Sequence, residues 1–180
     1  MMKVNKGTLP QRRSIRLPRY NYAHPGSYFI TICVQDYQCL FGQVSKHQMH
    51  LNPAGSMVEQ WIEKTTRKFS DITIPSFVIM PNHVHLIVTV WSKRYEDDAS
   101  ATAGDHMGLP LRDIIGWYKT MTTNAYIRGV KGDAWLRFNG RLWQRNYYEH
   151  IIRDDEDMSR IRDYIHNNPA NWNTDSLYKP

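Results

Sequence analysis

The sequence predicts an α+β domain in which helices pack on an antiparallel sheet. Two regions, residues 28–35 and 72–90, are rich in β-branched and aromatic residues, as strands are. Three other regions carry apolar residues at helical spacing. The strands within 72–90 are joined too closely for a crossover helix, which favours antiparallel pairing. The 180 residues suffice for one domain with a hydrophobic core, and no internal repeat is visible.

The expected strands lie in the first half of the chain. Residues 28–35, YFITICVQ, form one strand, and the segment around Gly42 forms a second short strand or a hairpin. The long β region 72–90 splits into two strands at Met80-Pro81-Asn82, because proline and asparagine favour a turn.

Three helices are expected, at residues 52–69, 111–128 and 154–169. Acidic residues crowd the first turn of the last one, where they complement the helix dipole, and Pro169 ends it. Residues 91–110 are polar and aperiodic, which predicts a long loop. Residues 141–153 are mixed aromatic and basic, and we assign no element there. The expected order is strand, strand, helix, strand, strand, helix, helix.

The charge is unevenly distributed. The formal net charge is +6, and residues 1–35 contain six basic residues and no acid. The remaining chain carries 17 basic and 17 acidic residues. A basic arm on a neutral body suits a polyanion such as nucleic acid, although a solubilising tail explains the charge equally well.

The only cysteines, Cys33 and Cys39, have no metal-binding spacing. This usage favours a reducing compartment. No apolar run has the pattern of a signal peptide or the length of a membrane span. We therefore expect a soluble cytoplasmic protein.

Two histidines, His83 and His85, stand in the strand sequence HVHLIVTV. Side chains alternate along a strand, so both imidazoles project to one side, roughly 7 Å apart along the chain, while Val84, Leu86 and Val88 face the core. Two such imidazoles can hold one metal ion, with a third ligand from elsewhere. Alternatively, they form a polar patch on a half-exposed sheet.

The last helix offers a third ligand and a nucleophile. Met158, Ile161 and Ile165 form an apolar stripe, and Tyr164 and Asn168, spaced i and i+4, lie together at its edge. An amide oxygen can bind a hard metal, and a phenol beside a metal can attack phosphorus. The alternatives are that Tyr164 merely packs and that Asn168 merely ends the helix. Tyr147 and Tyr148 are rival nucleophiles.

Together these residues resemble a known family. PNHVHLIV, followed by RLWQRNYYEHIIRDDEDMSRIRDYIHNNP, is similar to the REP-associated tyrosine transposases, which belong to the HUH single-tyrosine superfamily. The segment RRSIRLPRYNYAHPGSYFITICVQDYQCLFG resembles the start of many such proteins. The resemblance covers residues 12–172 and implies a ferredoxin-like sheet whose central strand carries the histidines.

By motif position, the resemblance makes His83 and His85 metal ligands and Tyr164 the catalytic tyrosine. Asn168 stands where related enzymes place a polar third ligand. Family knowledge favours Mg²⁺ or Mn²⁺, although ligand softness alone would also allow Zn²⁺. The implied organisation is a basic arm at 1–20, one catalytic domain at 21–172 and a tail at 173–180.

The family acts on single-stranded DNA near palindromes that fold as hairpins, beside a short guide sequence. The resemblance therefore implies a DNA partner, a nucleoid-associated location, no membrane, and a monomer or a homodimer. It gives the basic and aromatic residues a DNA-binding role, with Lys119 and Arg128 expected on the exposed side of their helix. The candidates for DNA contact are Arg12, Arg13, Arg16, Arg19, Lys119, Arg128, Trp143, Arg145, Tyr147 and Tyr148.

The sequence therefore predicts a metal-dependent single-stranded DNA endonuclease and strand transferase that acts through a 5′-phosphotyrosine at Tyr164. Three other functions stay open from sequence. They are a non-catalytic nucleic-acid-binding module, a nuclease in which water is the nucleophile, and a structural protein stabilised by zinc. Whether one molecule supplies both halves of the site also stays open, and His150 has no assigned role.

Overall fold

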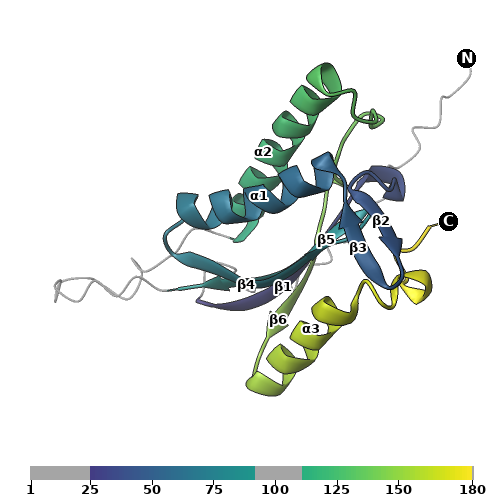
Figure 1. Cartoon of the computed structure of the whole chain (residues 1–180). Helices are drawn as coiled ribbons and strands as arrows, with labels where there is room; N and C mark the ends of the chain where they lie inside the picture. Colours follow the sequence, from purple (N-terminus) through teal and green to yellow (C-terminus); the bar gives the residue numbers. More distant parts are fainter. Residues whose placement is uncertain (1–24, 92–110, 180) are drawn as a thin grey trace, which may run out of the picture.

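The computed structural model describes residues 25–91 and 111–179 (Figure 1). The arginines proposed to contact DNA at positions 12–19 and most of the loop expected at 91–110 lie outside the described residues. The elements are β1 (Gly26–Cys33), β2 (Gly42–Ser45), β3 (Gln48–Leu51), α1 (Pro53–Lys68), β4 (Ile72–Ile79), β5 (His83–Val90), α2 (Leu111–Gly132), β6 (Tyr148–Ile152) and α3 (Asp155–Asn167).

Four strands form one antiparallel sheet in the order β4-β5-β1-β6. Without the β2–β3 hairpin, the chain order is β1-α1-β4-β5-α2-β6. This sequence of elements in this sheet order is the ferredoxin-like arrangement, which confirms the expected fold class. Strands β2 and β3, inserted between β1 and α1, confirm the hairpin that was one of the two alternatives expected around Gly42. The split of residues 72–90 at Met80-Pro81-Asn82 is also confirmed.

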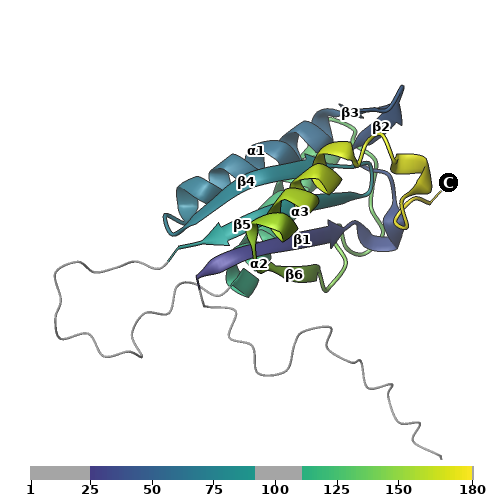
Figure 2. The same ribbon diagram turned by 90° about the horizontal axis from the view of Figure 1, so that it is seen from below.

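The sheet is covered on both faces. Helices α1 and α2 lie above it and α3 lies below it in Figure 1, and Figure 2 shows α3 crossing the sheet from the other side. The main core lies between the sheet and the first two helices and includes Val84, Leu86 and Val88 of β5, as predicted. A smaller cluster under α3 joins Phe29 and Ile87 to Ile161 and Ile165. The two central strands are therefore buried on both faces.

Strand β6 was not expected. Its sequence, YEHII, has five residues and no clean alternation, and its side chains are exposed or half-buried. It forms because its backbone pairs with the free edge of β1, with Phe29 opposite His150. A strand of this kind is decided by tertiary pairing rather than by local preference. Helix α2 also extends four residues beyond the expected end, to Gly132.

Helix α3 begins and ends close to the predicted positions. The Asp154 side chain caps its first turn by accepting a hydrogen bond from the Asp157 backbone amide at 2.8 Å. Three acids follow in that turn. None of the helices in the described parts of the chain has the length and apolar character needed to cross a membrane.

The small cluster under α3 should be essential for holding this helix on the sheet. Replacing buried Ile165 with alanine should lower the free energy of unfolding by about 2–5 kcal/mol, because it removes apolar contacts and leaves a cavity. Urea denaturation measures this. Leu136→Ala is the matched control: that side chain is exposed, so its loss should change stability by less than about 0.5 kcal/mol. Equal effects would contradict the assignment of Ile165 to a separate core.

Candidate active site

The histidine pair lies on β5, at the centre of the sheet, on the face covered by α3. The exposed fractions are 0% for His83 and 2% for His85, and the ring centroids are 4.4 Å apart. The alternative of a polar patch on a half-exposed sheet is therefore wrong. Burying two imidazoles is costly unless their nitrogen atoms have partners.

Each imidazole is oriented by a neighbour. His83 Nδ1 lies 2.8 Å from Asn82 Oδ1, an atom that only accepts, so His83 donates from Nδ1 and keeps a lone pair on Nε2. His83 Nε2 is buried and has no hydrogen-bond partner within residues 25–91 and 111–179. His85 Nδ1 lies 2.8 Å from Thr31 Oγ1, and Thr31 is its register partner on β1. Such outer contacts fix the ring orientation of metal-binding histidines.

Burial keeps both imidazoles neutral. It lowers the pKa of His83 to about 4, against the opposing effects of the Asp175 charge and of the nearby Asn168 side chain. It also lowers the pKa of His85, and the neighbouring His83 adds to that effect. The neutral imidazole is the form that binds a metal.

Asn168 reaches the same point from the end of α3, and Asp175 reaches it from the segment that follows. Asn168 donates from Nδ2 to Asp175 Oδ2 at 2.9 Å, which leaves its Oδ1 buried and without a partner. Asp175 Oδ1 accepts from the Leu177 backbone amide at 2.7 Å. Ligand atoms of His83, His85 and Asp175 all lie within 4.8 Å of one another.

This donor set fits a divalent metal ion. It offers two neutral imidazoles, a carboxylate and an amide oxygen, and two of its buried polar atoms, His83 Nε2 and Asn168 Oδ1, have no other partner. Sequence reasoning missed Asp175. Nothing marks it locally, because its position depends on the short turn at 172–174 that folds the chain back after α3.

The segment after α3 is held against the histidines. Asn82 Nδ2 donates to the Leu177 carbonyl at 2.9 Å, and the Trp172 ring lies 5.9 Å from His83, centroid to centroid. Tyr178 packs edge-on against Trp172 at 5.1 Å. Residues expected to form a tail therefore border the site.

Tyr164 lies beside His85. Its hydroxyl is 3.4 Å from His85 Nε2, and its ring packs edge-on against Phe29 with centroids 5.9 Å apart. Its side chain is 45% exposed, so a ligand can reach it from solvent. Partial burial, together with the charge of Asp175, raises the pKa of the phenol, which is therefore protonated at neutral pH.

Comparison with known proteins supports the resemblance noted in the sequence. The chain is 39% identical to an uncharacterized Haemophilus influenzae protein, over 98% of this chain and 97% of the relative. It is 26% identical, over 84% of this chain and 74% of the relative, to a second Haemophilus influenzae protein provisionally named a REP-associated tyrosine transposase. The chain is therefore similar to a REP-associated tyrosine transposase. No protein-family model matches it.

A solved REP-associated tyrosine transposase bound to a REP hairpin has the same fold. The TM-score is 0.58 at 23% identity, and the match covers 87% of this chain and 73% of the solved one. This likeness agrees with the sheet order described above.

A cleft of about 380 Å³ opens in front of Tyr164 and His85. Tyr147 and Tyr148, the rival nucleophiles that the sequence suggests, line the same cleft, and Tyr148 is 50% exposed. The Tyr164 hydroxyl lies beside His85, a histidine of the cluster.

Two residues expected to contact DNA have structural roles instead. Trp143 is 4% exposed and donates from Nε1 to Thr122 Oγ1 at 2.9 Å, so its ring offers no face to a base. Lys119 is half-buried rather than on an exposed helix side, and it donates to the carbonyls of Gln144 at 2.6 Å and Arg145 at 3.0 Å. Arg128 and Arg145 are exposed, as a DNA contact requires.

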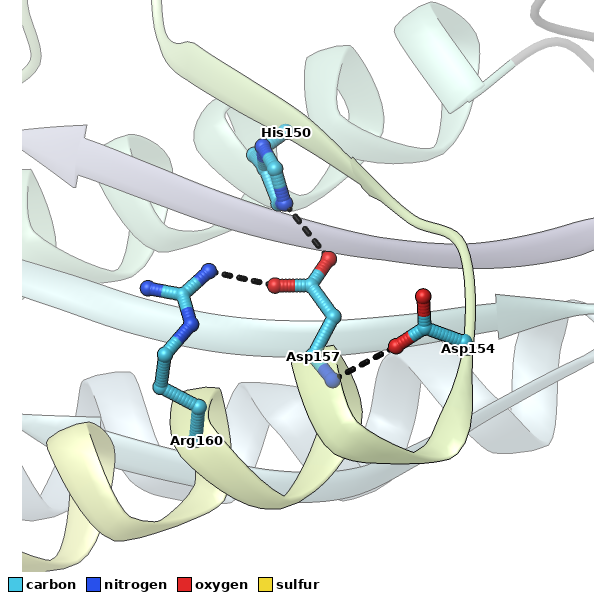
Figure 3. A network of polar contacts seen from close by, with 4 residues as sticks. All are labelled: His150, Asp154, Asp157 and Arg160. Atoms are coloured by element: carbon cyan, nitrogen blue, oxygen red, sulfur yellow. Dashed lines mark hydrogen bonds and ion pairs between the residues drawn. The ribbon is translucent and has the colours of Figure 1, made fainter.

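His150 joins β6 to the first turn of α3. Figure 3 shows its ring pointing at Asp157, and His150 Nε2 lies 2.7 Å from Asp157 Oδ2. The other oxygen of Asp157 accepts from Arg160. These two partners, His150 first, lower the pKa of Asp157. The network ties the start of the helix that carries Tyr164 to the edge of the sheet.

The donor set predicts metal binding that depends on Asp175. Calorimetric titration of Mn²⁺ should show that His85→Ala removes binding and that Asp175→Asn weakens it by about 10- to 100-fold, because the neutral amide supplies less charge and no longer orients Asn168 in the same way. Asp163→Asn, an exposed change on α3, is the control and should bind like the parent. Unchanged affinity in Asp175→Asn would contradict the role given to this carboxylate.

The His150 network predicts a pH-dependent contribution to stability. Because the pKa of Asp157 is lowered in the folded state, its stabilisation is present at neutral pH and is lost as the pH falls through that lowered pKa. Asp157→Asn should therefore lower Tm by a few degrees at pH 7, and the difference from the parent should shrink in acid. Asp155→Asn, in the same helical turn and exposed, controls for the helix dipole. A difference that stays constant with pH would contradict this reading.

Proposed function

We propose that this chain is a metal-dependent endonuclease and strand transferase for single-stranded DNA, with Tyr164 as the nucleophile. The observation that carries the proposal is the position of the Tyr164 hydroxyl, 3.4 Å from His85 Nε2 and open to the cleft. The other donors, His83, Asn168 and Asp175, lie on the same side of the sheet.

The chain's own groups account for the steps of cleavage. A DNA phosphate enters the cleft, and the phenolic oxygen of Tyr164 attacks phosphorus in line with the bond to the 3′-oxygen. The O–P bond to tyrosine forms as the bond to the 3′-oxygen breaks. The phenol loses its proton to solvent, and the leaving 3′-oxygen gains one. The product is a 5′-phosphotyrosine and a free 3′-hydroxyl.

Rejoining is the same reaction with a different nucleophile. A DNA 3′-hydroxyl attacks the phosphotyrosine and displaces Tyr164. With a pKa of about 10 in its unperturbed state, a phenol leaves more easily than an aliphatic alkoxide, so rejoining needs no ATP. Phe29 holds the tyrosine ring by an edge contact in the meantime.

Four residues of this chain would hold the metal ion: His83, His85, Asn168 and Asp175. Two oxygen donors beside two imidazoles are compatible with Mg²⁺ or Mn²⁺, which we propose as the ion. When bound there, such an ion would supply Lewis acidity, which would stabilise negative charge on the phosphate and on the leaving oxygen.

The proposed substrate is single-stranded DNA that carries a hairpin next to a short unpaired guide sequence. The support is the relative whose solved structure holds a REP hairpin. In the described part of the chain, histidines and tyrosine meet within one molecule. This geometry is compatible with a monomer that is complete in cis, and exchange of the tyrosine helix in a dimer is the alternative.

A denaturing gel tests the nucleophile. The parent protein, incubated with Mn²⁺ and labelled single-stranded hairpins from the palindromes that flank its own gene, should give a protein-sized labelled adduct. In Tyr164→Phe the rate of adduct formation should fall by at least about 10³-fold, because the proposed nucleophile is missing. Tyr148→Phe, in the same cleft, is the matched control and should keep the adduct.

Two outcomes would contradict the proposal. Cleavage without an adduct, unaffected by Tyr164→Phe, would show that water is the nucleophile. Binding without cleavage by the parent, on hairpins from both ends of its element and with either metal, would indicate a non-catalytic DNA-binding protein.

A further inference from the structure

We propose that the unpaired strand of the DNA follows a groove from the Tyr164 cleft along residues 133–147 to the C-terminal end of α2. This inference rests on the proposed function and names the path of its substrate. In Figure 1 the segment leaves the end of α2 and descends across the side of the molecule to β6. It therefore links a distant helix end to the edge of the active-site cleft.

The groove consists of three cavities that share lining residues. The cleft at Tyr164 and a second cavity, of about 370 Å³, share Gln144. The second cavity and a third, of about 280 Å³, share Ile127 and Phe138. Among the described residues, no acidic side chain lines any of the three. The three hollows are therefore neighbours, joined by the residues that they share.

The charge of the groove differs from that of the domain around it. Residues 114–148 contain six basic residues and one acid, Asp133, whereas the rest of the chain after residue 35 contains 11 basic and 16 acidic residues. Residues 36–180 have no net charge as a whole, but the segment 114–148 within them is basic. A basic groove beside an active site attracts the phosphates of DNA.

The basic side chains of the groove are available for a ligand. Lys131, Arg137, Arg141 and Arg145 line the second and third cavities together and show no ion pair with another described residue. Lys131, Arg141 and Arg145 are exposed. Lys119 is the exception, because its ammonium group holds the carbonyls of Gln144 and Arg145.

The shape and lining favour a single strand over a duplex. Ile127 is exposed and Phe138 half-exposed, so apolar surface lies between the cations where the second and third cavities meet. In proteins that bind single strands, basic side chains contact the phosphate backbone, and aromatic or apolar surface contacts the unstacked bases. The alternation seen here suits that kind of ligand. A duplex presents phosphates but keeps its bases stacked, so it gains nothing from the apolar hollows.

The floor of the groove is fixed by the core. Tyr126 donates from its hydroxyl to the Leu136 carbonyl at 2.9 Å, and the Trp135 and Phe138 rings pack against Tyr126 with centroids 5.3 and 5.6 Å away. Trp143 is held by Thr122. These aromatic contacts thus hold the segment in place, while its arginines stay at the surface.

The test measures binding by fluorescence anisotropy in the Tyr164→Phe background, with hairpins that carry unpaired flanks of increasing length on either side. The affinity of this reference protein should rise with flank length on one side. Adding Arg137→Ala and Arg141→Ala should remove that rise and lower the slope of log K against log salt by about 1.4, because two phosphate contacts to a single strand are lost. Binding of the hairpin without a flank should not change.

Lys64→Ala with Lys68→Ala is the matched control, since it removes two exposed charges from α1, away from the groove, and should leave the flank dependence intact. As a second measurement, a photoreactive base in the flank should crosslink within residues 127–145. Equal loss of affinity for the hairpin without a flank would overturn the inference and assign the groove to the stem. Unchanged flank dependence, or crosslinks elsewhere, would also overturn it. The adduct gel on the parent reports separately on the proposed function.

Discussion

The pairing of β1 with β5 is the interaction on which the rest of the structure depends. Its register sets Thr31 opposite His85 and Phe29 opposite Ile87. Thr31 orients His85, and Phe29 packs against both His85 and Tyr164. A slip of one residue would turn both imidazoles into the core under α1 and α2. The backbone ladder at the centre of the sheet therefore decides the geometry of the site.

The second constraint is the cost of burying polar groups. His83 Nε2 and Asn168 Oδ1 have no hydrogen-bond partner among the described residues, and leaving such buried atoms unpaired is costly. The chain nevertheless builds a second layer around them, in which Asn82 contacts both His83 and the Leu177 carbonyl. Two unpaired polar atoms in such an ordered environment are explained if a cation binds between them and serves as their missing partner.

The basic residues that the sequence suggested for DNA binding have different roles in the structure. Some hold the backbone in place, and others are exposed to solvent. Lys119 pins the backbone between two cavities, whereas Arg145, whose carbonyl it holds, stays at the surface. Likewise, Trp143 fills the core while Tyr148 remains half-exposed in the cleft. The segment 133–147 thus supplies both the packed aromatic residues beneath the groove and the basic residues exposed along it.

The sequence by itself determined the fold class, the strand that carries His83 and His85, and the helix that presents Tyr164 and Asn168, because alternation, helical spacing and capping are local properties. The roles of these residues as metal ligands and nucleophile were inferred from the family resemblance, because helical spacing and strand alternation do not indicate chemical function. The tertiary structure alone decided strand β6, which needs the edge of β1, and Asp175, whose place depends on how the chain turns after α3. It also decided which charges face solvent, because burial depends on what packs against a side chain rather than on its neighbours in sequence.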